Sequence, residues 1–162
     1  MPVEEVTILD LASSELEFFR SLKKLILQSS EQIELENMDN LMHVLQEKQK
    51  MISQYDVISE EWNKIGLSLE IKDGYNNPDF WKYLFNMFSA GSSEKGCFSD
   101  KLELLLEQRK TLVEELLKIQ DDAREVLNEY VKRLRSRISQ ISKGRDACKG
   151  YAAAGGASWS CY

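Results

Sequence analysis

Two long stretches of apolar residues at helical spacing, residues 14–69 and 99–141, make up most of this 162-residue chain. Proline is the residue that most strongly breaks a helix interior, and the only prolines are Pro2 and Pro78. Both stretches can therefore form long helices with an apolar stripe on one face. We predict an all-α fold, a long antiparallel helical hairpin or bundle with coiled-coil character and a short aromatic helix between the long ones.

The first stretch has a start signal and a weak point. Ser14 and Glu17 have the spacing of a capping box, which predicts a helix start at Ser14 after a lead-in of residues 1–13. The weak point is the segment Glu36–Asn40, because Asn and Asp favour helix caps over helix interiors. A break or kink near Asp39 is therefore left open.

The two long stretches are joined by a segment of mixed character. Lys72–Pro78 is predicted to be a loop, with Asn77 as a helix cap and Pro78 at the first helical position. Phe80–Phe88 then forms a short helix that is apolar on nearly every side. We expect it to pack against the long helices, with a binding surface as the alternative. Ala90–Gly96 is interpreted as a linker.

The second stretch is close to a heptad repeat, with Ser99 or Asp100 as its cap. From Leu105 to Tyr130 its seam alternates steps of four and three residues, the coiled-coil spacing: Leu105, Arg109, Leu112, Leu116, Ile119, Ala123, Val126 and Tyr130, with Leu134, Ile138 and Ile141 beyond. The pattern stops after Gly144. We therefore predict one helical domain at residues 1–143 and a flexible Gly/Ala/Ser-rich tail at 144–162.

The charge is unevenly distributed along the chain. From Tyr130 to the end there are seven Lys and Arg and one Asp, a net charge of +6, while the rest carries −12. An acidic body disfavours nonspecific binding to nucleic acid. The basic end fits either an acidic partner or the preference of cations for helix C-termini.

No constellation in the sequence indicates catalysis, a cofactor or a metal. His43 is the only histidine, and a zinc or di-iron site needs several converging ligands. No histidine or other base is spaced to activate a serine or cysteine nucleophile, and no glycine-rich phosphate loop opens a helix. We expect a protein that is not an enzyme and that binds other proteins.

The cysteines and the N-terminus bear on location. Cys97, Cys148 and Cys161 form no C-x-x-C pair, and three free thiols suit a reducing cytoplasm. The first residues lack the basic and apolar regions of a signal peptide. No apolar run approaches the ~20 residues of a membrane span. We expect a cytoplasmic protein without membrane insertion.

One stretch resembles a known family. Its pattern is carried by Leu25, Glu31, Leu35, Asp39, Leu45, Lys48 and Ile52. It is similar to the first helical region of the FlgN family, the flagellar export chaperones for hook-associated proteins. The resemblance implies a bacterial cytoplasmic chaperone that binds helical ends of hook-filament junction proteins and keeps them unassembled before export. The aromatic segment Pro78–Phe88 departs from the family pattern as an insertion.

The resemblance also suggests functional residues. The client surface would lie on the last helix, at Leu112, Leu116, Ile119, Val126, Tyr130 and Leu134. For each of these, packing inside the chain's own core is the alternative, because the first long helix also needs a partner. In the tail, Tyr151 and Trp159 would dock to the export gate by the same analogy.

Two other functions compete with the chaperone. The first is a self-associating coiled-coil scaffold, in which the seam from Leu105 to Tyr130 pairs with its own copy. A homodimer that pairs through the same seam is also compatible with the chaperone hypothesis. The second is a binder of nucleic acid or acidic proteins through Lys132–Arg145, which predicts binding that weakens steeply with salt.

Overall fold

The computed structural model describes residues 4–89 and 95–155, and within these ranges it contains helices and no strands. The long helices are α1 (Glu5–Glu34), α2 (Met38–Ser68) and α4 (Lys95–Gly155). Between α2 and α4 lie a 3-10 turn, η1 (Gly74–Asn76), and the short helix α3 (Phe80–Ser89). The all-α prediction is confirmed. The chain divides into two compact units, residues 1–123 and 124–162.

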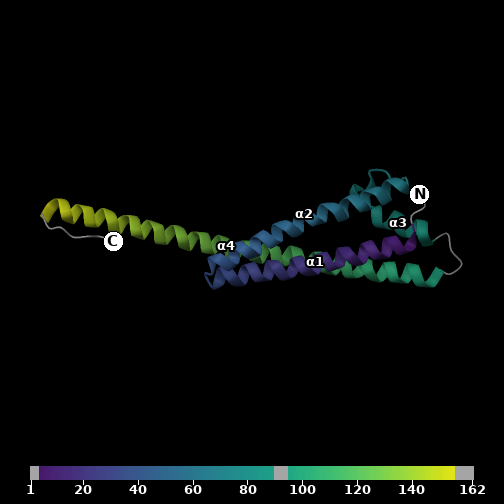
Figure 1. Ribbon diagram of the computed structural model, residues 1–162, viewed down its shortest axis with the longest axis horizontal. Coiled ribbons are helices and arrows are strands. Elements are labelled where there is room, and N and C mark those ends of the chain that lie inside the picture. The colour runs from purple at the N-terminus through teal and green to yellow at the C-terminus, as the bar shows by residue number, and fades with distance from the viewer. Residues whose placement is uncertain (1–3, 90–94, 156–162) are drawn as a thin grey trace. The chain divides into compact units, whose positions relative to one another are not determined.

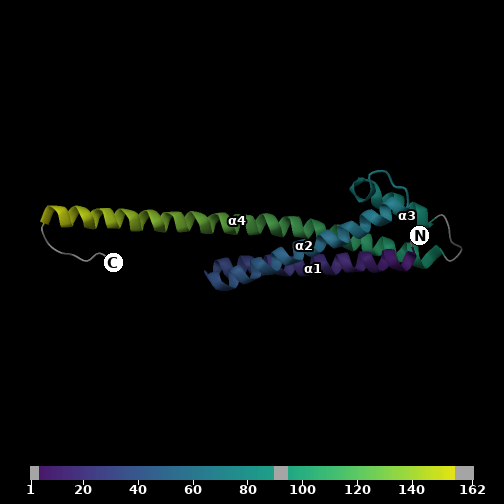
Figure 2. The ribbon, with the colours of Figure 1, turned by 45° about the horizontal axis from the view of Figure 1, so that its top comes forward.

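The first long stretch is two helices, because it breaks between Glu34 and Met38. Glu36 has a φ of 53°, a left-handed conformation that reverses the chain. The Asn37 side chain accepts a hydrogen bond from the backbone N–H of Asn40 and so caps α2. The break that the sequence left open near Asp39 is therefore real, and α1 and α2 form an antiparallel pair, side by side in both views (Figures 1 and 2).

The start of α1 differs from the prediction. The helix begins at Glu5 rather than Ser14, and Ser14 and Glu17 are exposed residues inside it. Ile8 and Ala12, expected in a lead-in, are buried against Trp62 of α2. This tertiary packing extends the helix beyond the local capping signal.

The turn from α2 to α3 depends on a close approach of two glycines. A Cβ on Gly66 of α2 would lie 2.9 Å from Gly74 Cα and 3.1 Å from a ring carbon of Phe80. Asn77 supports the turn, because its amide donates to the Lys72 carbonyl and its carbonyl oxygen accepts from the Asp79 N–H. Asn77 thus stabilises the turn before α3 rather than the first turn of the helix, and because α3 begins at Phe80 the prediction of Pro78 at the first helical position is wrong.

Two apolar clusters form the core of the unit 1–123. The first gathers residues of α1, α2, α3 and α4, and its largest fully buried side chains are Trp62, Phe80, Leu84, Ile8 and Leu102. The second joins Leu16 and Ile26 of α1 to Leu112 and Leu116 of α4. The aromatic helix α3 thus packs against the long helices, as expected. The pairs Glu15–Arg109 and Lys23–Glu115 show that α1 and α4 run in the same direction.

The end of α4 also differs from the prediction. Residues 144–155, expected in a flexible tail, continue the helix, and residues 156–162 lie outside the described part of the chain. The run Ala152–Ala154 has the highest intrinsic helix propensity, which favours this extension. Cys148 takes part in a disulfide, so the expectation of three free thiols is wrong. The cysteines no longer indicate a reducing compartment.

Candidate functional site

A buried carboxylate joins the helices of the unit 1–123. The Glu15 side chain of α1 is only 1% exposed. Its Oε1 accepts hydrogen bonds from Arg109 of α4, at 3.1 and 3.2 Å, and from the hydroxyls of Tyr55 and Tyr75, at 3.3 and 3.2 Å. Its Oε2 accepts the indole N–H of Trp62 at 3.0 Å. We call Glu15, Tyr55, Trp62, Tyr75 and Arg109 the polar cluster.

Aromatic rings surround the charged part of the polar cluster. The Arg109 guanidinium lies 5.0 Å from the centre of the Trp81 ring and 5.7 Å from that of Phe19. Such cation–π contacts favour a cation that is partly removed from water. The Arg109 side chain is 24% exposed, so the pair with Glu15 is largely desolvated.

The polar cluster holds its tyrosines in the protonated form. Burial raises the pKa of Tyr55, and its hydrogen bond with Tyr75 and the negative charge of Glu15 act in the same direction. Burial and the Glu15 charge also raise the pKa of Tyr75. Burial, the largest single influence, lowers the pKa of Arg109, but the charges of and hydrogen bonds to Glu15 and Tyr75 together raise it. The cluster is therefore a Glu⁻/Arg⁺ pair held by neutral hydroxyls.

The arrangement indicates a structural role for the polar cluster. Four side chains contact one carboxylate, Arg109 also donates to the Tyr75 hydroxyl, and the residues come from α1, α2, η1 and α4. A buried ion pair of this kind fixes which residues of neighbouring helices face one another. Sequence reasoning singled out Arg109 as a polar member of the seam but missed Glu15. The available signal was a charged residue between Ala12 and Leu16, within the apolar face of α1.

The six residues predicted to bind a client lie mostly in the interior. Leu112 and Leu116 are buried against α1, and Ile119 packs on the same cluster. Tyr130 is also buried, while Val126 and Leu134 are half-buried. Whether these residues bind a client stays a prediction. In this structure, at least Leu112 and Leu116 serve the chain's own core, the alternative that the sequence left open.

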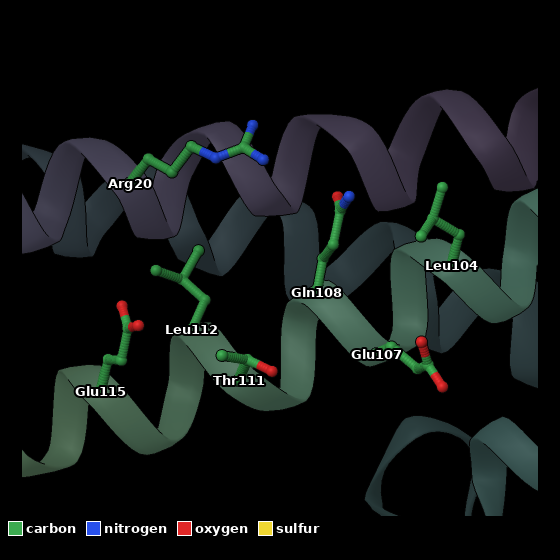
Figure 3. Close-up of a pocket in the computed structure, with 7 residues that line it drawn as sticks. All are labelled: Arg20, Leu104, Glu107, Gln108, Thr111, Leu112 and Glu115. Atoms are coloured by element: carbon green, nitrogen blue, oxygen red, sulfur yellow. The ribbon is translucent and has the colours of Figure 1, made fainter.

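An open groove of about 410 Å³ lies between α1 and α4 (Figure 3). Leu104, Gln108 and Leu112 point from α4 toward α1, and Arg20 lies across from them on α1. Glu107, Thr111 and Glu115 complete the lining. A second groove of about 360 Å³ lies between α3 and α4, with Trp81, Phe85 and Leu106 in its lining. Leu112 is thus a core residue that also borders a groove.

The unit 124–162 presents an exposed apolar stripe on α4. Leu127, Val131, Leu134, Ile138 and Ile141 follow one another at alternating steps of four and three residues, which places them on one face. Leu127 is 45% exposed, Ile138 65% and Ile141 58%, while Val131 and Leu134 are half-buried. We call these five residues the C-terminal stripe. It shares Leu134 with the predicted client set.

The predicted docking residues fall at the end of the chain. Tyr151 lies on α4 and is 78% exposed, so its ring is accessible to a partner. Trp159 lies outside the described residues.

In the ranges 4–89 and 95–155, no group of three or more His, Cys, Asp or Glu side chains could hold a metal ion. His43 is an exposed residue of α2. Across the same part of the chain, no helix combines the length and the apolarity needed to cross a membrane.

Comparison of the chain with protein families, with curated proteins and with solved structures gives no match in any of the three.

Proposed function

We propose that this chain is a helical chaperone for protein export, which binds an amphipathic helix of its client on the C-terminal stripe. The observation that carries the proposal is the exposure of Leu127, Ile138 and Ile141 on one face of a long helix. An amphipathic helix in water is stable when its apolar face packs on a partner. A client helix with its own apolar stripe fits this face, the mode of recognition by helix packing.

The resemblance of residues 25–52 to the FlgN family supplies the class of client. On that basis the clients are the hook-associated proteins of the bacterial flagellum, and the chaperone keeps their helical ends unassembled until the export apparatus receives them. Such ends carry apolar stripes that would otherwise self-associate, and covering them explains the need for a chaperone. The proposal also includes a cytoplasmic location. The disulfide at Cys148 does not support this location, because disulfides are rare in reducing compartments.

The structure changes the surface that the proposal uses. Leu112 and Leu116 are needed to hold α4 on α1, so a client would have to displace α1 to reach them. The C-terminal stripe needs no such displacement, because its residues are already exposed. We therefore place the client on α4 beyond Ala123.

The test is complex formation with purified hook-filament junction proteins. The expected result is a soluble complex of defined mass by light scattering, together with slower self-association of the client. Absence of a complex at concentrations well above ~10 μM would overturn the proposal, since weaker binding corresponds to less than about 7 kcal/mol.

The alternative of a self-associating scaffold is tested in the same instrument. A scaffold predicts an assembly of the chain alone that persists on dilution. Much of the seam that a scaffold would use, including Leu112 and Leu116, is already buried within one chain, which counts against this alternative.

A further inference from the structure

The charges beside the C-terminal stripe are of one sign. In a heptad repeat abcdefg, positions a and d form the apolar seam; here Val131 and Ile138 are at a, and Leu127, Leu134 and Ile141 are at d. Positions e and g lie on either side of the seam and face the e and g positions of a partner helix. Along residues 127–144 these positions are occupied by Asn128, Tyr130, Arg135, Arg137, Ser142 and Gly144. The flanks therefore carry two arginines and no acidic residue, and both arginines are exposed.

The surrounding helix strengthens the positive field. Lys132, Arg133, Lys143, Arg145 and Lys149 are all exposed on the same segment, and Asp146 is the one acid from Tyr130 to the end of the chain. Two of these cations have partners within the helix: the Lys132 Nζ donates to Glu129 Oε1 at 3.0 Å, and the Arg133 guanidinium lies 5.9 Å from the centre of the Tyr130 ring. Exposed charges of one sign beside an apolar stripe favour a partner helix that carries the opposite charge.

This charge pattern disfavours a second copy of the chain as the occupant. In an antiparallel pair, Arg135 would face Arg135 of the second copy, and Arg137 would face Arg137. In a parallel pair, each arginine would find only a neutral residue or another arginine on the opposite flank. Like charges across a seam are destabilising, and such repulsion is a common way of rejecting wrong partners.

We infer that the C-terminal stripe is selective for an amphipathic helix of another protein that carries Asp or Glu on both sides of its apolar face. Acidic flanks would meet Arg135 and Arg137 while the apolar stripes pack together. This inference rests on the proposed function, because it names the class of client helix for the surface proposed there. The same chemistry lets the clients of this chain be recognised from their sequences.

The test uses two synthetic helical peptides with the same Leu seam, one with Glu and the other with Lys at the flanking positions. Binding to the full chain is measured by fluorescence anisotropy. We expect the Glu peptide to bind at least about tenfold more tightly in low salt, and the preference to shrink as salt screens the exposed charges. The chain with Arg135→Glu and Arg137→Glu is expected to prefer the Lys peptide.

The controls separate the possible failures. Ile138→Asp should bind neither peptide, and the circular dichroism of all variants should match that of the parent because the positions are exposed. Equal affinity for the two peptides, preference for the Lys peptide, or no binding of either up to ~100 μM would each overturn the inference.

Three further outcomes distinguish a membrane partner, a failure of the proposed function and a failure of the inference. If vesicles of phosphatidylglycerol bind the chain through Ile138 while the peptides show no preference, the surface belongs to an anionic membrane and the inference is wrong. If the Glu peptide is preferred but hook-associated proteins do not bind, the flagellar function fails and the inference stands. If those proteins bind without dependence on Arg135 and Arg137, the function stands and the inference fails.

Discussion

Glu15 is the residue on which the packing of the unit 1–123 most depends. It is fully buried and accepts hydrogen bonds from four other side chains on three separate elements. Removing one partner of a buried ion pair is costly because the other charge stays buried without compensation. The polar cluster therefore acts as a fixed point between the two apolar clusters, ordered along α1 as Ala12, Glu15 and Leu16.

The first prediction concerns the charge of Glu15. Glu15→Gln keeps the size of the side chain but leaves Arg109 without its counter-charge, so the free energy of unfolding should fall by about 3 kcal/mol. Urea unfolding measures this change. The matched control is Glu17→Gln, which removes an exposed pair with Arg20 and should change stability by less than about 1 kcal/mol. Equal losses of unfolding free energy in the two variants would show that the buried ion pair stabilises the fold no more than the exposed one.

The second prediction concerns alkaline pH. The pKa values of Tyr55 and Tyr75 are raised in the folded chain, so above about pH 10 the folded state holds protons that the unfolded state has released. Stability is then lost as pH rises through this range. The unfolding free energy should fall more steeply above pH 10 in the parent than in the double variant Tyr55→Phe and Tyr75→Phe. Parallel pH profiles for the two proteins would contradict the prediction.

At the scale of elements, the turn that joins α2, η1 and α3 leaves no room for a side chain at Gly66. The backbone of Gly74 and the ring of Phe80 occupy the place of its Cβ. A glycine inside a helix normally lowers stability relative to alanine. Glycine is nevertheless required at position 66, because the Gly74 backbone and the Phe80 ring leave no room for a larger side chain.

The third prediction compares two glycines of helices. Gly66→Ala should destabilise the chain by about 1–3 kcal/mol, because the contact at 2.9 Å forces a backbone shift that outweighs the better helix propensity. Gly144→Ala meets no atom within 4 Å and should stabilise α4 by up to about 1 kcal/mol. Thermal unfolding of both variants tests the pair. A stabilising Gly66→Ala would mean that α2 and η1 are not packed so closely.

The sequence predicts the helices well and their ends poorly. The 3.6-residue periodicity locates the long helices, and Asn37 is a cap residue whose role follows from local chemistry. The start of α1 could not be predicted, because Ile8 and Ala12 are held by Trp62, which is distant in sequence. The polar cluster is hidden for the same reason. It forms only when α1, α2, η1 and α4 come together.

At the scale of the whole molecule, the two units have different characters. The unit 1–123 buries its apolar seam within one chain, as Leu112 and Leu116 show. The unit 124–162 carries the C-terminal stripe with exposed apolar and basic residues. Sequence analysis did not separate the two, because apolar residues at helical spacing continue from Leu105 to Ile141 and do not record where α1 ends. The client surface is therefore proposed on the part of the pattern whose residues stay exposed.

The central claim is that buried and exposed parts of the α4 seam have different functions. It is tested most directly by measuring the melting temperature and the client affinity of two variants, Leu116→Asp and Ile138→Asp. Leu116 is 8% exposed, so an aspartate there should destabilise the fold by several kcal/mol. Ile138 is 65% exposed, so Ile138→Asp should melt like the parent and lose the hook-filament junction proteins. Normal melting together with undiminished binding by Ile138→Asp would contradict the account.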